Sequence, residues 1–371
     1  MISYIDQSDD ENRLESCRSI AHFLSLYCER DNKSLEIRDL LLRDLCWRAS
    51  SLDPLDKAIV MAESSYSLLP KNIKAAFTED SIGMSELGTL MASKKQRKDV
   101  GIITVVRPEL RAVLSSLGRN TADLDLADKR SDGFLYWFAD VDRYHGPPLS
   151  VVVTLVGEPR NVPCAIAVEH VLGDYDVDLL MLVGIAAGPR EKVKLGDAVA
   201  AERVYDYEHV RLELFRLFGI PLVIPVRRPR PDYRNVDKEV QVALERYDGS
   251  QMQTFFRGLL SQSGTADLPN GMDSTSFLPD FHRGTIAAGE KLIADGTLSR
   301  MFRKIDQEIR AGDQEDNGFA LAAEHKKIKW CIFRGIADYG DPTKAKNWQF
   351  VAALSAASAA ITFLRSVWKN V

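Results

Sequence analysis

The chain has 371 residues, of which 45% are hydrophobic and 27% are charged, and these proportions are ordinary for a soluble globular protein. Its formal net charge of −5 argues against general nucleic-acid binding, which needs a basic domain or stripe. Small molecules and protein partners are therefore the expected ligands.

Cysteine usage and the start of the chain bear on compartment and metal binding. The five cysteines are odd in number and have no CxxC spacing, so we expect buried free thiols in a reducing cytosol. The six histidines form no cluster with cysteines, which argues against a zinc site, and we expect no cofactor. The N-terminus lacks a signal-peptide pattern, and no apolar stretch approaches the roughly 20 residues that span a membrane. These features predict a cytoplasmic protein.

Residues 1–98 are predicted to form a small all-α module. Apolar residues recur at three- and four-residue steps from Leu14 to Cys28, which places them on one helix face. Further on, Asp53-Pro54 supplies an N-cap and a first-turn proline. The patterns predict three helices, at residues 14–28, 35–47 and 55–69. We interpret the module as an oligomerisation or partner-docking unit; the alternative is a subdomain that only buries an apolar face.

The second predicted domain, residues 99–371, begins with a buried strand. The run Val100–Val106 is nearly continuously apolar and β-branched, as in a central parallel strand. A helix is expected to follow, through Leu117. Glu109 lies near the start of that helix, where a carboxylate stabilises the helix dipole. From these residues alone, Glu109 is either a structural first-turn acid or a functional group.

A glycine-containing turn follows another apolar run. Strands are predicted at residues 134–139 and 149–156, a helix at 162–172, and a further strand at Val177–Val183. That strand leads into Gly184-Ile185-Ala186-Ala187-Gly188. Small residues here would let the backbone approach a flat ligand closely.

Four arginines are concentrated in the long interval between Asp206 and Arg283, which otherwise predicts helices at 236–246 and 253–260. They lie in the segment 226–234, which is interpreted as a basic loop. Guanidinium forks suit phosphate groups, so this loop is either an exposed basic surface or a binding site for a nucleotide tail. The arginines are Arg227, Arg228, Arg230 and Arg234.

The chain's last predicted strand ends in a polar rim. An apolar run from Ile328 to Phe333 stops at Arg334-Gly335-Ile336-Ala337-Asp338, and ligands of parallel sheets bind at such strand ends. Desolvation there can raise the pKa of a carboxyl and allow it to donate a proton near neutral pH. The alternative is that Arg334 and Asp338 form a structural pair.

Three motifs in the same order resemble the purine nucleoside phosphorylase and nucleosidase superfamily, and most of all its branch of methylthioadenosine/S-adenosylhomocysteine nucleosidases. They are VGIITVVRPELRAVL, DLLMLVGIAAG with VKLGDAVAAERVYDY, and RGIADYGD with KNWQFVAALSAASAAITFL. The resemblance implies an α/β fold in three layers, with a central mixed sheet flanked by helices. It also implies a homo-oligomer.

The resemblance implies roles for particular residues. Asp338 would protonate or hydrogen-bond purine N7, and Glu109 would activate the attacking water. Asn317 would replace the family glutamate that grips the ribose, and Asp316 the methionine under the sugar. Asparagine brings no charge, so the sugar would be held differently or activity would be reduced. The other expected substrate contacts are Ile185, Ala186, Gly188, Leu292, Ile293, Phe319 and Arg334.

The residues before the glycine turn favour water over phosphate as nucleophile. Hexameric phosphorylases of the superfamily carry an arginine there, and this chain has Met181-Leu182-Val183. We therefore predict a purine nucleosidase that releases adenine from a nucleoside or nucleotide, with ATP depletion in antiviral defence as a sharper hypothesis. The alternatives are a phosphorylase whose phosphate site uses Arg160 or the arginine loop, and a binding module inactivated by Asn317.

Overall fold

The computed structural model describes residues 95–369, apart from 120–123, 125, 132, 218–219, 231, 263–267, 270–271, 273–275, 292–295 and 342–345, and without the side chains of 212–229 and 346. The chain divides into two units, Met1–Lys95 and Gln96–Val371. The predicted helical module falls almost entirely in the first unit. It lies outside the described residues and stays a prediction.

A mixed sheet forms the centre of the second unit. In the described part of the chain it has ten strands, in the order β11-β8-β12-β13-β7-β2-β5-β4-β3, and β14 pairs with β7 and β8. The strands are β2 (Val100–Thr104), β3 (Lys129–Ser131), β4 (Phe134–Val141), β5 (Leu149–Leu155), β7 (Leu179–Ala187), β8 (Ala198–Asp206), β11 (Tyr233–Asn235), β12 (Phe281–Ala288), β13 (Ile309–Asp313) and β14 (Lys329–Asp338). A separate short pair joins β1 (Gln96–Arg97) to β6 (Tyr175–Asp176).

The register of the central strands brings their carboxyl ends to one edge. β7 runs parallel to both β2 and β14, and Asp338 at the end of β14 pairs with Ala187 at the end of β7. β13 meets the same point, because Gly312 pairs with Ala187. Residues that follow these strands are therefore placed side by side, as expected for a ligand site in an α/β sheet.

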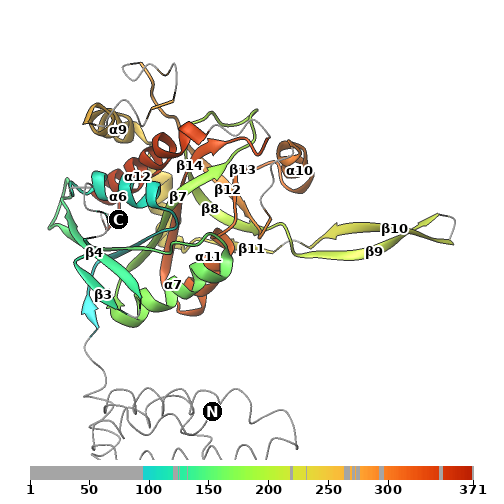
Figure 1. Ribbon diagram of the computed structural model, residues 1–371, viewed down its shortest axis with the longest axis horizontal. Coiled ribbons are helices and arrows are strands. Elements are labelled where there is room, and N and C mark those ends of the chain that lie inside the picture. The colour runs from blue at the N-terminus through green and yellow to red at the C-terminus, as the bar shows by residue number, and fades with distance from the viewer. Residues whose placement is uncertain are drawn as a thin grey trace, which may run out of the picture. The chain divides into compact units, whose positions relative to one another are not determined.

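Helices cover both faces of the sheet (Figure 1). On one face α12 (Gln349–Ser366) packs against α6 (Arg107–Ser116), α9 (Ser250–Gln262) and strand β14, and on the other α7 (Asn161–Asp174) packs against α11 (Asp316–His325). The remaining helices are α8 (Lys238–Arg246), α10 (Leu298–Ile305) and the 3-10 turn η4 (Lys346–Trp348). The predicted fold class, a mixed sheet flanked by helices, is confirmed.

Helix α12 is the core helix of this domain. It is the one helix of the described part that is long and apolar enough to cross a membrane, and 78% of it is buried inside the protein. A contact with β14 brings the two backbones close, because a Cβ on Gly335 would overlap the carbonyl group of Ala352. The glycine therefore sets how closely α12 approaches the strand that ends at Asp338.

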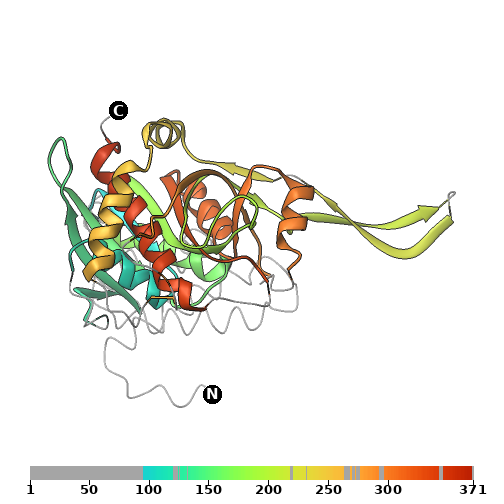
Figure 2. The same ribbon diagram turned by 90° about the horizontal axis from the view of Figure 1, so that it is seen from above.

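The interval between Asp206 and Arg283 differs from the prediction. Residues 226–229 of the segment interpreted as a basic loop form the end of a long hairpin, β9 (Val210–Leu217) and β10 (Ile220–Pro229), which projects from the domain (Figures 1 and 2), and Arg234 lies in the short strand β11. Pro221 and Pro225 in β10 are turn signals in the sequence, but the hairpin tolerates them because a two-stranded ribbon leaves one edge of each strand unpaired. The two predicted helices in this interval are present as α8 and α9.

We expect Gly335→Ala to lower the free energy of unfolding by on the order of 1–3 kcal/mol, because the added methyl group overpacks the contact between α12 and β14. The matched control is Gly173→Ala in α7, where a Cβ has open space. This change should raise stability by up to about 1 kcal/mol through helix propensity. Urea denaturation of both variants measures the difference, and equal stabilities would contradict the close-packing argument.

Candidate active site

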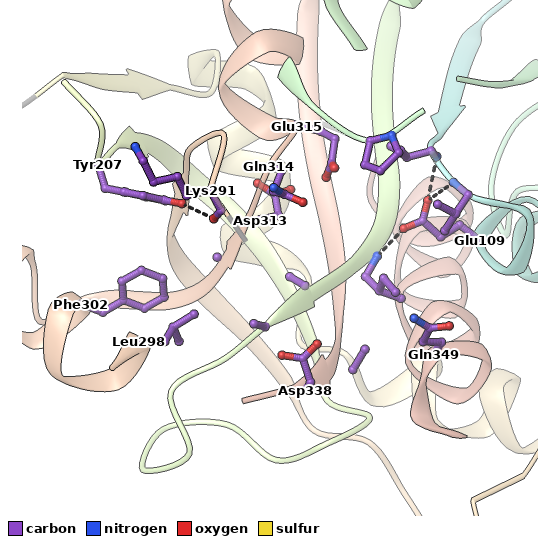
Figure 3. Close-up of a pocket in the computed structure, with 18 residues that line it drawn as sticks. Glu109, Tyr207, Lys291, Leu298, Phe302, Asp313, Gln314, Glu315, Asp338 and Gln349 are labelled. Carbon is purple, nitrogen blue, oxygen red and sulfur yellow. Dashed lines mark hydrogen bonds between the residues drawn. The ribbon is translucent and has the colours of Figure 1, made fainter. Parts of the chain in front are cut away.

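A cavity of about 330 Å³ lies where the carboxyl ends of the central strands meet (Figure 3). This volume suits a small molecule. Most of its lining comes from segments far apart in sequence, which only the sheet brings together. The lining residues are Val105, Val106, Glu109, Pro159, Ile185, Ala186, Ala187, Tyr207, Lys291, Leu298, Phe302, Gly312, Asp313, Gln314, Glu315, Ala337, Asp338 and Gln349.

Glu109 is buried at one side of this cavity, in the first turn of α6. Its Oε2 accepts hydrogen bonds from the backbone N–H groups of Val105 (2.7 Å) and Val106 (3.0 Å), and its Oε1 accepts one from Ile185 (2.8 Å). Burial raises the pKa of Glu109, although Arg334 and these N–H donors oppose the shift. The carboxyl is thus both oriented by backbone donors and made more basic than usual.

Asp338 lines another part of the cavity, at the end of β14 (Figure 3). Its Oδ1 accepts a hydrogen bond of 2.7 Å from the N–H of Gly340, and its carbonyl oxygen accepts one of 2.9 Å from the N–H of Gly188. The side chain is half-buried. These bonds hold the carboxyl at the cavity and leave Oδ2 without a partner among the described residues.

Behind the cavity wall, the fully buried Arg334 binds several carboxylates. Its guanidinium pairs with Asp316, Asp313 and Glu315 (3.3 Å for Glu315), and lies 3.9 Å from Glu109. Gly184 makes room for this arrangement, because a Cβ there would overlap both Arg334 and Glu109. The five charged side chains form what we call the Arg334 cluster, and they are all buried.

The Arg334 cluster contains four acids and one base, so it retains protons. Burial raises the pKa of Glu315 to about 7 and that of Asp313 well above its ordinary value. Burial opposes the charge on Arg334 as well, but Asp313, Asp316 and the other acids hold its pKa well above the usual value. Arg334 therefore stays cationic, while part of the acid charge is neutralised by bound protons.

A family model described as the phosphorylase superfamily matches residues 99–368 of the chain. The chain belongs to this superfamily. It is 28% identical over 268 residues to ATP nucleosidase Cap17 from Escherichia coli strain KTE188 and from Escherichia coli, which covers 72% of this chain and 51% of those proteins. The chain thus spans about half the length of the curated relatives it matches.

Solved structures show the same fold. The domain aligns with futalosine hydrolase of Helicobacter pylori and with the 5′-methylthioadenosine/S-adenosyl homocysteine nucleosidase of that organism in complex with an inhibitor. Each alignment has a TM-score of 0.50 and 13% identity, and covers 73% of this chain and 98% of the other. The predicted superfamily and its fold are therefore confirmed.

The structure brings together some of the predicted site residues of this superfamily member. Glu109 and Asp338 line the same cavity, together with Ile185 and Ala186. Gly188 does not line it. A Cβ on Gly188 would crowd Val193, so this glycine serves the packing of the turn.

The predicted ribose contacts are displaced by two residues. Asn317 does not line the cavity: its Nδ2 donates to Asp206 (3.1 Å) and its Oδ1 accepts from Arg234 (2.9 Å). Asp316 is buried against Arg334, and Phe319 packs on Trp330. These three side chains are not among the residues that line the cavity, and their contact with a substrate stays a prediction. Arg334 also lies behind the wall rather than in it.

The residues that take their place are Asp313, Gln314 and Glu315, which line the cavity. The sequence did contain a signal for them. The acid-x-acid spacing of the family motif fits Asp313-Gln314-Glu315, whereas the segment beginning at Glu315 has Asn317 in place of the second acid. Tyr207, the last residue of the motif VKLGDAVAAERVYDY, also lines the cavity, as do Leu298 and Phe302, which lie outside the quoted motifs.

The predicted phosphate contacts do not line the cavity in the described part of the protein. Arg234 pairs with Asp232 and Glu324, and Arg230 is exposed beyond the end of β10. Arg160 is exposed directly after the lining residue Pro159. The side chains of Arg227 and Arg228, and all of Leu292 and Ile293, lie outside the described residues.

The raised pKa of Glu315, about 7, predicts a pH-dependent stability. An unfolded glutamate titrates near 4.3, so the folded state binds this proton more tightly. The stability it contributes is complete below about pH 4 and is lost as the pH rises through about 7. Glu315→Gln imitates the protonated form. Relative to the wild type, we expect the free energy of unfolding of this variant to gain on the order of 3–4 kcal/mol between pH 4 and pH 8.5.

Urea denaturation at several pH values measures this gain. The matched control is Glu158→Gln, at an exposed position. The difference in free energy of unfolding between this control and the wild type should be the same at every pH. If the difference between Glu315→Gln and the wild type does not change with pH, Glu315 does not carry the expected proton.

Proposed function

We propose that the chain hydrolyses the N-glycosidic bond of a purine nucleoside or nucleotide and releases adenine. The observation that carries this proposal is the cavity at the sheet edge, which Asp338 and Glu109 both line. One carboxyl is free to meet the base, and the other is oriented by backbone donors and buried. This is the pair of groups that acid–base cleavage of a glycosidic bond requires.

In the proposed reaction Asp338 donates a proton to purine N7 while the bond between C1′ and N9 breaks and its electron pair passes to the base. Glu109 accepts a proton from water, whose oxygen forms the new bond to C1′. The products are the free base and the sugar. The raised pKa of Glu109 makes it a stronger base than an exposed glutamate, which suits this role.

Glu315 is the proposed partner of the ribose hydroxyl groups, with Gln314 and Asp313 beside it. All three line the cavity, and the cluster supplies negative charge near the position where C1′ becomes positive. A preorganised negative site of this kind stabilises an oxocarbenium-like transition state. In this proposal Glu315 supplies the charge that Asn317 lacks, which favours an enzyme over the alternative of an inactive binding module.

Water is the proposed nucleophile. Among the described lining residues, Lys291 is the one cation, and its Nζ lies 2.5 Å from Glu208 Oε1. A phosphate ion would meet four carboxyl groups and one already paired lysine among the charged lining residues, which disfavours its binding. Phosphorolysis stays the alternative that a phosphate-dependent assay would reveal.

ATP is the substrate that we propose for this chain, following the name of the relatives, ATP nucleosidase Cap17. Cleavage of ATP to adenine would deplete the cell of nucleotide, which fits an effector of antiviral defence. The buried free thiols of Cys164 and Cys331 support a cytoplasmic location. Residues 1–98 are proposed to bind a partner or a second copy and so control the enzyme.

We further propose that the enzyme is a homo-oligomer in which the hairpin of β9 and β10 contacts a second copy. A two-stranded ribbon is marginally stable alone, and residues 210–229 carry many Leu, Ile, Val and Phe residues. Replacing residues 214–225 by a short Asn-Gly turn should therefore reduce the mass in light scattering from an oligomer to a monomer. An unchanged mass would remove the hairpin from the interface.

Chromatography of purified full-length protein tests the reaction. We expect free base from adenosine, AMP or ATP without added phosphate, and a loss of at least about 100-fold in rate for Asp338→Asn and for Glu109→Gln. Asp140→Asn, an exposed carboxyl on β4, is the matched control and should keep its activity. Full activity in either active-site variant would remove the role assigned to that residue, and strict dependence on phosphate would indicate a phosphorylase.

A further inference from the structure

The cavity repels the charged part of a nucleotide. Four carboxyl groups line it, those of Glu109, Asp313, Glu315 and Asp338, and Lys291 is already paired. The base and the ribose can form hydrogen bonds with these carboxyl groups whether they are protonated or ionised, but a triphosphate is repelled by those that stay ionised. A nucleotide must therefore place its phosphates outside the acidic cavity.

The chemistry of a nucleoside indicates where the phosphates leave. The base is attached at C1′ and the 5′ tail at C4′, the two carbons that flank the ring oxygen, so the tail leaves the ribose at a different carbon from the base. In Figure 3, Leu298 and Phe302 offer an apolar wall for the base, whereas Glu109 and Gln349 lie on the other side of Asp338. We place the base at this apolar wall and the ribose between Glu109 and Glu315. The 5′-phosphate tail then leaves the cavity at the end where Glu109 lies.

Two turns border that end of the cavity. Val106 lines it and donates its N–H to Glu109. The turn that contains Pro159 lies beside it, because the N–H of Gly157 donates to the carbonyl oxygen of Val105 at 3.0 Å. Each of the two lining residues, Val106 and Pro159, is followed directly by an arginine.

These arginines and one neighbour make the rim of the cavity basic. Arg107 is exposed at the start of α6, and Arg111 lies one helical turn later, with its Cζ 4.6 Å from the ring centre of Phe350, the residue after Gln349. Arg160 is exposed as well. One exposed acid, Glu158, lies in the same turn as Arg160, so arginines outnumber acids in these two turns.

Arg160 has two features that a purely structural role does not explain. Its φ is 124°, a backbone conformation that costs free energy in residues other than glycine. Its guanidinium makes no ion pair or hydrogen bond with any residue in the described part of the chain. The strain is therefore not offset by a contact of this side chain, which leaves the guanidinium available to a ligand.

We propose that Arg107, Arg111 and Arg160 bind the 5′-phosphates of the substrate and make the enzyme select nucleotides over nucleosides. This inference rests on the proposed nucleosidase function. Guanidinium groups bind phosphate through two parallel charge-assisted hydrogen bonds. The acidic interior would then stabilise the reacting sugar while the basic rim holds the tail.

The test compares ATP with adenosine as substrates of the full-length protein. We expect Arg107→Gln and Arg160→Gly each to lower the ratio of kcat/KM for ATP to that for adenosine by about 10-fold or more, since each removes charge-assisted hydrogen bonds. Arg160→Gly suits the positive φ, and Arg160→Lys should recover part of the ratio by restoring charge. The matched control is Arg130→Gln on the edge strand β3, where the ratio should not change.

A second measurement removes the dependence on turnover. In an Asp338→Asn background, equilibrium binding of ATP should weaken about 10-fold with Arg107→Gln or Arg160→Gly, whereas binding of adenosine should change far less. If the arginine variants leave unchanged both the ratio of kcat/KM and the ratio of affinity for ATP to those for adenosine, the rim does not bind the 5′-phosphates. The nucleosidase proposal still stands in that case. If wild-type protein releases no base from either substrate, the proposed function fails, and the affinity ratio still tests the rim.

Discussion

One buried guanidinium holds the candidate active site together. Arg334 is completely buried, and Glu109, Asp313, Glu315 and Asp316 surround it. A buried charge without partners is strongly destabilising, for the arginine as for each acid. Each charged group reduces the free-energy cost of burying the others. The cluster therefore holds the ends of β13 and β14 and the start of α6 close together.

The same interaction tunes the chemistry of the cavity. Four acids share one cation, so protons stay bound to some of them near neutral pH, as the pKa of about 7 for Glu315 indicates. Glu109 is separately fixed by three backbone N–H groups. Its geometry therefore depends on how β7 pairs with its neighbours, since the N–H of Ile185 belongs to that strand. Sheet register and acid–base chemistry are coupled in this way.

The charges of the domain are arranged by depth. The interior of the cavity is acidic and suits a sugar that becomes positive during bond cleavage, whereas its rim carries Arg107, Arg111 and Arg160. In this proposal, a protein with a net charge of −5 accepts an anionic substrate because the position of a few arginines matters more than the sum of charges. This division of charge is the physical basis of the proposed nucleotide preference.

The sequence by itself determined the main strands and helices and the superfamily, because buried runs and short motifs are local patterns. It also pointed to Glu109 and Asp338, which follow predicted strands directly. Only the tertiary structure showed that Glu315 lines the cavity and Asn317 does not, since the sequence motif can be aligned in two overlapping registers and the position of each side chain depends on the start of α11. The projecting hairpin and the basic rim were hidden for the same reason: they depend on which distant segments meet, and local sequence does not record that.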